Sequence, residues 1–222
     1  RVIDRPMRPL FPKDYRNDVT LNNLVMSVDP DCSPEVTAML GSAIATSISD
    51  IPFDGPIAAT QVGLIDGEFV FNPTTDQKNV SDLSLTVAST RDKVIMIEAG
   101  ANEVPEDKMI EAIFAAHELN QKIIKFIDVI VAECGKEKHS YESCSVPEEV
   151  MEAIKAIITP EQMEEAVFTD EKQVREENIR QIKEKLAEAF ADNEEWLGYI
   201  DDAVYQYQKK TVRKMILKDH KR

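Results

Sequence analysis

The chain is poor in cysteine, glycine and tryptophan, and it contains no long uninterrupted apolar run. Three cysteines among 222 residues do not build a disulfide framework, so reduced thiols are expected. No stretch approaches the ~18 apolar residues that cross a bilayer. The N-terminus also lacks the basic, apolar and small-residue regions of an export signal. These absences predict a soluble cytoplasmic protein.

Patterns that would mark a catalytic or metal site are missing as well. The glycines form neither a phosphate-binding loop nor a dinucleotide fingerprint, and no Ser-His-Asp or Cys-His nucleophile pattern is recognisable. Cys134, His139 and Cys144 lack a fourth ligand at a usual zinc spacing. Neighbouring carboxylates are explained as turn residues or solvated helix positions. These carboxylate pairs are Asp29 with Asp31, Asp50 with Asp54, and Asp201 with Asp202. The sequence therefore nominates no catalytic residue and no metal ligand.

Charge is unevenly distributed along the chain. The net charge of −15 argues against broad, nonspecific binding of nucleic acid. Both ends are nevertheless basic: residues 1–17 carry five basic side chains against two acidic ones, and residues 207–222 carry seven against one. Basic ends on an acidic body can steer a polyanion to one place, or they can be solvated helix faces. Composition alone leaves both interpretations open.

The first part of the chain combines helices with β-structure. Pro6 and Pro9 limit the N-terminal segment to a short helix or turn, and the apolar residues within 17–28 predict a strand. Ser33 followed by Pro34 is typical of a helix start.

Two hairpins and one long helix are expected next. Asp66-Gly67 predicts the tight turn of a hairpin over residues 57–72, and apolar alternation predicts a second hairpin over residues 83–97. An amphipathic series from Met109 to Cys134 predicts a long helix that Gly135 stops. His117 on this helix is interpreted as a hydrogen-bonded histidine at a domain seam, because no catalytic partner is visible.

Residues 136–145 are polar and predict a linker, after which only helical patterns occur. Thr159 and Gln162 form a capping box, and two apolar stripes follow. We therefore expect an α+β chain, in which an α/β domain precedes a small all-α domain of three or four helices.

Arg1, Arg5 and Arg8 are the candidate RNA-binding residues. Their spacings of four and three would place all three on one face of a helical turn. Guanidinium groups bind phosphate oxygens bidentately and keep their charge at any relevant pH. The competing interpretation is that they form salt bridges to acids such as Asp4 and Asp14.

Three ordered strings carry a family resemblance. SDIPFDGPIAA (residues 49–59) and VGLIDGEFVFNPT (residues 62–74) closely resemble the segment that marks the RNase PH superfamily, and RVIDRPMRPLFP (residues 1–12) resembles a second block of it. Gln61 stands where an arginine is common in the family, and Ser89 where glycine is usual. Because the chain opens on Arg1 inside such a block, we expect it to be part of a longer protein.

The resemblance implies a domain plan. Residues 1–143 would be the C-terminal part of a first RNase PH-like domain, incomplete at its N-terminus. Residues 144–222 would be the all-α linker domain that precedes a second RNase PH domain. A half-built domain exposes a sheet edge, so we expect the isolated chain to form non-native dimers or larger species.

The resemblance also implies a function for the parent protein. Members of this kind are ring-shaped homotrimers that degrade single-stranded RNA from its 3′ end with inorganic phosphate and release nucleoside diphosphates. They require Mg²⁺ or Mn²⁺, which would be bound outside this chain, in the second RNase PH domain. Arg1, Arg5 and Arg8 would lie beside the RNA path, and RNA-decay proteins are possible partners. We expect this chain alone to be inactive; the alternative is a stand-alone, non-enzymatic RNA-binding or scaffold module.

Overall fold

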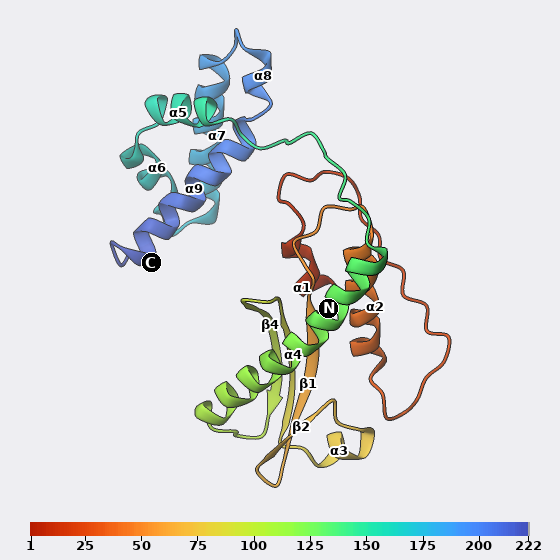
Figure 1. Ribbon diagram of the computed structural model, residues 1–222. Helices are drawn as coiled ribbons and strands as arrows, with labels where there is room; N and C mark the ends of the chain where they lie inside the picture. Colours follow the sequence, from red (N-terminus) through yellow and green to blue (C-terminus); the bar gives the residue numbers. More distant parts are fainter. Residues whose placement is uncertain (222) are drawn as a thin grey trace. The chain divides into compact units, whose positions relative to one another are not determined.

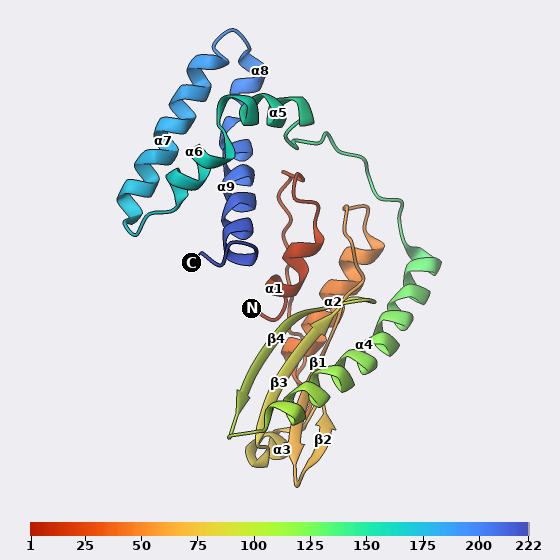
Figure 2. The same cartoon turned by 90° about the vertical axis from the view of Figure 1, so that its left-hand side faces the viewer.

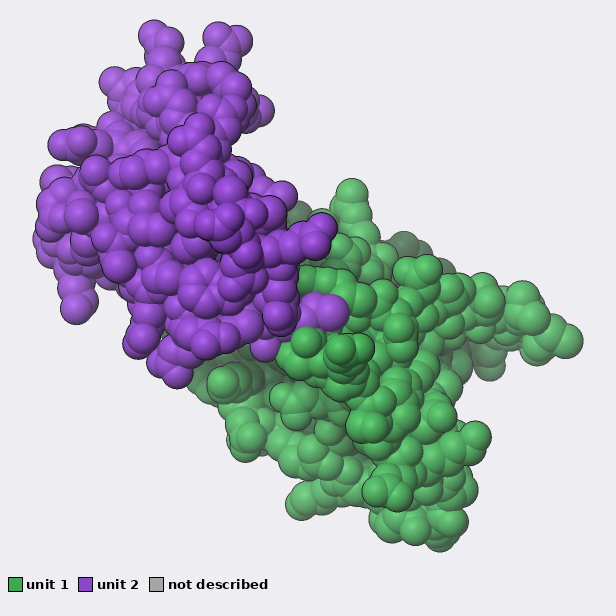
Figure 3. Space-filling model, turned by 90° about the horizontal axis from the view of Figure 1, so that it is seen from above, with its two compact units in different colours: residues 1–143 green, residues 144–222 purple. Residues whose placement is uncertain are grey.

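The computed structural model describes residues 1–221 and divides the chain into two compact units. Unit 1 comprises Arg1–Ser143 and unit 2 comprises Cys144–Arg222 (Figures 1 and 3). Unit 1 combines a small antiparallel sheet with helices, and unit 2 is helical, so the predicted α+β class is confirmed. Within the described residues, no helix is both long enough and apolar enough to cross a membrane.

Unit 1 contains one four-stranded antiparallel sheet in the order β2-β1-β3-β4. Both predicted hairpins are confirmed, and the turn of the first uses positive φ at Asp66 (49°) and Gly67 (82°). The elements of unit 1 are α1 (Asp4–Met7), the 3₁₀ helix η1 (Arg8–Leu10), α2 (Pro34–Ile48), β1 (Ala58–Ile65), β2 (Glu68–Phe71), α3 (Thr75–Val80), β3 (Leu83–Ser89), β4 (Val94–Ala101) and α4 (Glu106–Cys134).

The long helix α4 runs along the sheet and continues onto α2 (Figure 2). Its first half packs Ala112 and Ala116 against apolar residues of β1 and β3. Its second half places Ile127 in a separate cluster with Met7 of α1 and Met39 of α2. The small alanines bring the helix close to the sheet, while α2 supports the part of α4 that extends past it.

A buried polar group fixes α4 against the strands. Asn120, fully buried, donates from Nδ2 to the carbonyl oxygen of Val87 (3.1 Å) and to Oγ of Ser89 (2.9 Å). Its Oδ1 accepts a hydrogen bond from the hydroxyl of Thr60 at 2.7 Å. Since an unpaired buried polar group is costly, these bonds select one register of the helix on β1 and β3. Ser89, in place of the family's usual glycine, contributes a side chain to this network.

The predicted strand at residues 17–28 is wrong. No helix or strand is assigned between Arg16 and Pro34, and Leu24, Val25 and Met26 are 84%, 62% and 90% exposed. A strand needs a neighbouring backbone to accept and donate its hydrogen bonds, and no described strand pairs with this segment. The apolar residues alone signal β-propensity and do not supply that partner.

The polar segment after α4 is attached to unit 1. The ammonium group of Lys138 donates to the carbonyl oxygens of Thr46, Ser47 and Ser49 at 2.6–3.0 Å, at the C-terminal end of α2. Burial lowers the pKa of Lys138, against an opposing attraction from Asp50. A cation at a helix C-terminus satisfies carbonyls that lack intrahelical partners. Thus this part of the predicted linker is fixed by contacts that are distant in sequence.

Gly135 ends α4 as predicted, but not in a left-handed conformation. Its φ is −66° and its ψ is 146°, an extended geometry, and its N–H donates to the Val131 carbonyl at 2.8 Å. An added Cβ would lie 2.4 Å from that same oxygen. Glycine is therefore required here by close backbone approach and not by positive φ.

Unit 2 buries an apolar core between its helices, with Ile154, Met163 and Leu186 fully buried. The predicted capping box is confirmed: Thr159 Oγ1 accepts from the Gln162 N–H, and the Gln162 side chain accepts from the Thr159 N–H. Up to residue 221, unit 2 has five helices where three or four were predicted, because a single-turn helix interrupts the last stripe. They are α5 (Glu148–Ile157), α6 (Pro160–Val167), α7 (Lys172–Ala189), α8 (Glu194–Leu197) and α9 (Ile200–Leu217).

Candidate nucleic-acid interface

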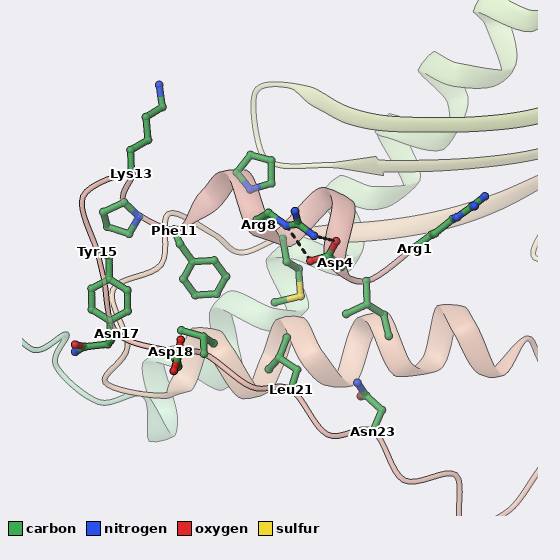
Figure 4. Close-up of a pocket in the computed structure, with 15 residues that line it drawn as sticks. Arg1, Asp4, Arg8, Phe11, Lys13, Tyr15, Asn17, Asp18, Leu21 and Asn23 are labelled. Atoms are coloured by element: carbon green, nitrogen blue, oxygen red, sulfur yellow. Dashed lines mark hydrogen bonds and ion pairs between the residues drawn. The ribbon is translucent and has the colours of Figure 1, made fainter. Parts of the chain in front are cut away.

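The N-terminal segment lines a surface depression of about 740 Å³ (Figure 4). All residues that line it lie between Arg1 and Asn23. Arg1 and Arg8 both line the depression, and Lys13 adds a third cation at its rim. Arg5 is exposed but is not among the lining residues. Two of the three predicted arginines therefore line the same depression, and Arg5, within the four-residue helix α1, does not.

Arg8 has a carboxylate partner within its own turn. Its Nε donates to Asp4 Oδ1 at 3.0 Å while its Nη2 contacts Asp4 Oδ2, and this pairing raises the pKa of Arg8. The competing salt-bridge interpretation is thus realised for Arg8. The two side chains are 75% and 56% exposed, and exposed ion pairs contribute only ~0–1 kcal/mol. A phosphate group can therefore replace Asp4 at little cost. Arg1 extends away from this pair (Figure 4).

An aromatic and hydroxyl cluster holds the loop that carries Lys13. The Tyr15 hydroxyl lies 3.2 Å from His139 Nε2, and the Tyr15 ring meets Tyr141 edge-on at 5.2 Å. Asp14 accepts hydrogen bonds from the hydroxyls of Ser143 (2.5 Å) and Tyr141 (2.9 Å). These two bonds, the Ser143 bond first, lower the pKa of Asp14, so it stays ionised as an acceptor. The loop is consequently tied to the segment that follows α4.

The other residues considered in the sequence analysis do not line this depression. His117 is half-buried and lies 3.4 Å from Gln121 Nε2, one turn further along α4. Asp29 accepts from the Asp31 N–H at 2.9 Å, as the turn interpretation predicts. Across residues 1–221, no three His, Cys, Asp or Glu side chains converge in a group that could hold a metal ion. Gln61 is half-buried on β1, and its Oε1 has no hydrogen-bond partner among the residues that the structure describes.

Comparison with known proteins gives the class first. Residues 55–118, which contain the β-sheet, match the family model described as 3′ exoribonuclease family, domain 2. Residues 149–222 match the model described as polyribonucleotide nucleotidyltransferase, RNA binding domain. The chain thus joins an RNase PH-type domain to a helical domain. Both matches are of the kind that the resemblance predicted, and the second is to the RNA-binding domain of polyribonucleotide nucleotidyltransferase.

Individual relatives agree with this assignment. The polyribonucleotide nucleotidyltransferase of Lachnoclostridium phytofermentans is 82% identical over 223 aligned residues, which cover 100% of this chain. The enzymes of Caldicellulosiruptor saccharolyticus and Ruminiclostridium cellulolyticum are each 48% identical over the same length. The chain spans 32% of the length of each of these relatives. Rice Rrp46 aligns with 47% of this chain at a TM-score of 0.43 and 15% identity, which is too distant to support an argument.

Proposed function

We propose that this chain is part of a 3′-to-5′ RNA-degrading phosphorolytic nucleotidyltransferase. In that reaction an oxygen of inorganic phosphate forms a bond to the terminal phosphodiester phosphorus. The bond to the 3′ oxygen of the preceding nucleotide breaks, that oxygen takes up a proton, and a nucleoside diphosphate leaves. The observation that carries the proposal is the 82% identity, along the whole chain, to a polyribonucleotide nucleotidyltransferase. The two family matches, one in each unit, support it.

Within the parent protein, we assign residues 1–143 to the later part of a first RNase PH-like domain and residues 144–222 to the all-α linker domain. The compact units support these bounds. By the same resemblance, the parent is a cytoplasmic homotrimer in which this part builds the ring and guides RNA, and RNA-decay proteins are its possible partners.

The role proposed for Arg1, Arg5 and Arg8 is to bind the RNA backbone. All three are exposed, and a guanidinium fork matches two phosphate oxygens. Arg8 would exchange the Asp4 carboxylate for a phosphate, while Arg1 has no ion-pair partner among residues 1–221 to leave.

Mg²⁺ or Mn²⁺ in the parent would neutralise charge on the transferring phosphoryl group. By the resemblance, that ion would be bound in the second RNase PH domain, outside this chain. The proposal assigns no step of the reaction to a metal held by this chain.

A variant of the longer protein tests this proposal. We expect Arg1→Gln/Arg5→Gln/Arg8→Gln to weaken binding of a single-stranded oligo(A). The slope of log affinity against log salt should fall by ~0.7 for each phosphate that is no longer neutralised. Lys78→Gln/Lys122→Gln/Lys125→Gln removes the same charge from exposed positions and should leave both quantities unchanged. Phosphorolysis is followed as ADP release from poly(A). A longer protein that binds oligo(A) but never releases ADP would favour the non-enzymatic RNA-binding module.

A further inference from the structure

The polar segment at residues 136–143, which we call the connector, is fixed at its beginning to the C-terminal end of α2. The backbone N–H of Lys136 donates to the Ile48 carbonyl at 2.9 Å. The ammonium of Lys138 adds its three hydrogen bonds to carbonyl oxygens at the same end of the helix. The connector therefore follows one path over unit 1, which is set by these bonds.

The second half of the connector contacts the loop that follows η1. The hydroxyls of Tyr141 and Ser143 donate to different carboxylate oxygens of Asp14, Oδ1 at 2.9 Å and Oδ2 at 2.5 Å. A carboxylate that is held at both oxygens cannot rotate without breaking one of these bonds. The neighbouring Tyr15 ring contacts the rings of His139 and Tyr141, with centroids 5.8 and 5.2 Å apart. Two consecutive loop residues are thus held by the connector.

The other contacts of this loop lie at its start and within its own turn. The ring of Phe11 packs against that of Phe53, with centroids 5.1 Å apart. Nη1 of Arg16 donates to the Lys13 carbonyl at 2.9 Å. The first contact fixes the loop where it leaves η1, and the second closes the turn around Lys13. The connector adds the support that reaches the middle of the loop from a distant part of the chain.

The position of this loop decides where one cation of the candidate interface lies. Lys13 lines the same depression as Arg1 and Arg8 and lies at its rim (Figure 4). A lysine is a point charge on a flexible stem, so the place of its backbone sets the region that its ammonium can reach. Tyr141 and Ser143 do not line the depression, yet they hold the residue that follows Lys13.

We propose that Tyr141 and Ser143 are positioning residues for RNA binding. Acting through Asp14, they hold the loop so that Lys13 meets a backbone phosphate at the depression. This inference rests on the proposed function and deepens it, because the stretch of chain that leads from unit 1 into unit 2 takes part in shaping the RNA site without lining it.

Removal of the two hydroxyls gives the first test. We expect Tyr141→Phe/Ser143→Ala, the connector variant, to weaken binding of a fluorescein-labelled oligo(A) by the full chain, by no more than Lys13→Gln does. In both variants the slope of log affinity against log salt should fall by up to ~0.7, the contribution of one phosphate on a single strand. A change of ~0.7 makes the loss of affinity at 50 mM salt ~2.6 times the loss at 200 mM.

Ser33→Ala/Thr75→Val is the matched control. Both hydroxyls also donate hydrogen bonds at short distance, to the Glu35 carboxylate (2.6 Å) and to the Pro30 carbonyl (2.5 Å). Neither residue lines the depression. The control should therefore keep the affinity and the salt slope of the wild type, and circular dichroism checks that the control and the connector variant are folded.

The second test separates positioning from a general loss of structure. If the two hydroxyls act through Lys13, Lys13→Gln/Tyr141→Phe/Ser143→Ala should bind as Lys13→Gln alone does, because one phosphate contact can be lost only once. Residues that act independently would instead give additive losses of binding free energy. Backbone amides at residues 13–16 should also exchange hydrogen faster in the connector variant than in the wild type, while those of β1 and β3 should not change.

Three results would overturn the inference. If the connector variant binds as the wild type does while Arg1→Gln/Arg5→Gln/Arg8→Gln loses binding, the inference fails and the proposed function stands. If the losses of the connector variant and of Lys13→Gln are additive, the connector does not act through that lysine. If the wild-type chain does not bind oligo(A) at 50 mM salt, both the inference and the RNA-guiding role proposed for this chain fail.

Discussion

The two units solve the problem of fixing their helices in different ways. In unit 1, the helix α4 is registered on the sheet by Asn120, whose amide is shared among three partners on two strands. In unit 2, the core consists almost entirely of aliphatic side chains and methionine, with Tyr207 donating a single hydrogen bond to the Ile158 carbonyl. Polar anchoring specifies one arrangement, whereas apolar packing tolerates substitution as long as volume is kept.

The two units also differ in whether their basic side chains form ion pairs. The arginines of unit 1 lie on a short helical segment, and Arg8 is already paired with Asp4. In unit 2, the helix α9 carries Lys209, Lys210, Arg213 and Lys214, and none of these forms an ion pair with another described residue.

The largest expected effect is in the apolar core of unit 2. Leu186 is fully buried, so Leu186→Ala should lower the free energy of unfolding by ~2–5 kcal/mol. Trp196 is the single tryptophan of the chain and packs edge-on against Phe190 at 5.2 Å. Its fluorescence during urea denaturation thus reports on unit 2. Leu217→Ala, at a position 66% exposed, is the control and should stay within ~0.5 kcal/mol of the wild type.

A comparable loss is expected at the polar anchor of unit 1. Asn120→Leu leaves the hydroxyls of Thr60 and Ser89 without partners in the interior and should cost ~2–4 kcal/mol, measured by far-UV circular dichroism. The Thr60→Val/Asn120→Leu pair should recover part of that loss, because it removes the Thr60 hydroxyl, one of the two that Asn120→Leu leaves unsatisfied. If Asn120→Leu also shifts the urea transition reported by Trp196 fluorescence, the polar anchor of unit 1 is not separate from the core of unit 2.

Smaller effects are expected at two glycines of unit 1. Gly41 lies in the middle of α2, and nothing is within 4 Å of an added Cβ, so Gly41→Ala should stabilise by ~0.5–1 kcal/mol. Gly135→Ala should destabilise, because its Cβ would press on the Val131 carbonyl. Thermal unfolding followed by circular dichroism should give opposite signs, and equal signs would contradict the close approach at Gly135.

The smallest effect concerns Asp14 and depends on pH. Hydrogen bonds from Ser143 and Tyr141 lower its pKa in the folded chain. Their contribution is therefore present above the unfolded pKa of ~3.9 and is lost as the pH falls through the folded pKa. We expect Asp14→Asn to increase amide hydrogen exchange at residues 141–143 at pH 6 and to match the wild type as the pH approaches the acid limit. If the difference in hydrogen exchange persists at all pH values, the ionised Asp14 carboxylate is not its cause.

Local signals account for most of what the sequence predicted correctly. Asp66-Gly67 marks a turn, Thr159 and Gln162 cap a helix, and the apolar period over Met109–Cys134 gives α4. Another local signal was overlooked: Thr74 and Gln77 form a capping box that starts α3. Where the outcome depended on a partner distant in sequence, prediction failed or was silent.

Three features illustrate that limit. The segment 17–28 has the composition of a strand but no described strand to pair with. Asn120 fits the helical period, yet its role depends on β1 and β3. At the candidate interface, the sequence left two interpretations open for Arg1, Arg5 and Arg8, a shared face or salt bridges to acids such as Asp4; the structure pairs Arg8 with Asp4 and leaves Arg5 outside the depression.

The attachment of Lys138 to the end of α2 has a consequence for limited proteolysis. A polar segment between two units, with lysines at 136 and 138, looks like a site where trypsin would separate them. Trypsin must take the lysine side chain into its specificity pocket, but the Lys138 ammonium is held by three carbonyls. The following peptide N–H, that of His139, is bonded to the Asp50 carbonyl. Cleavage after Lys138 therefore has to wait for a local opening of this segment, and its rate measures how often α2 and the segment part.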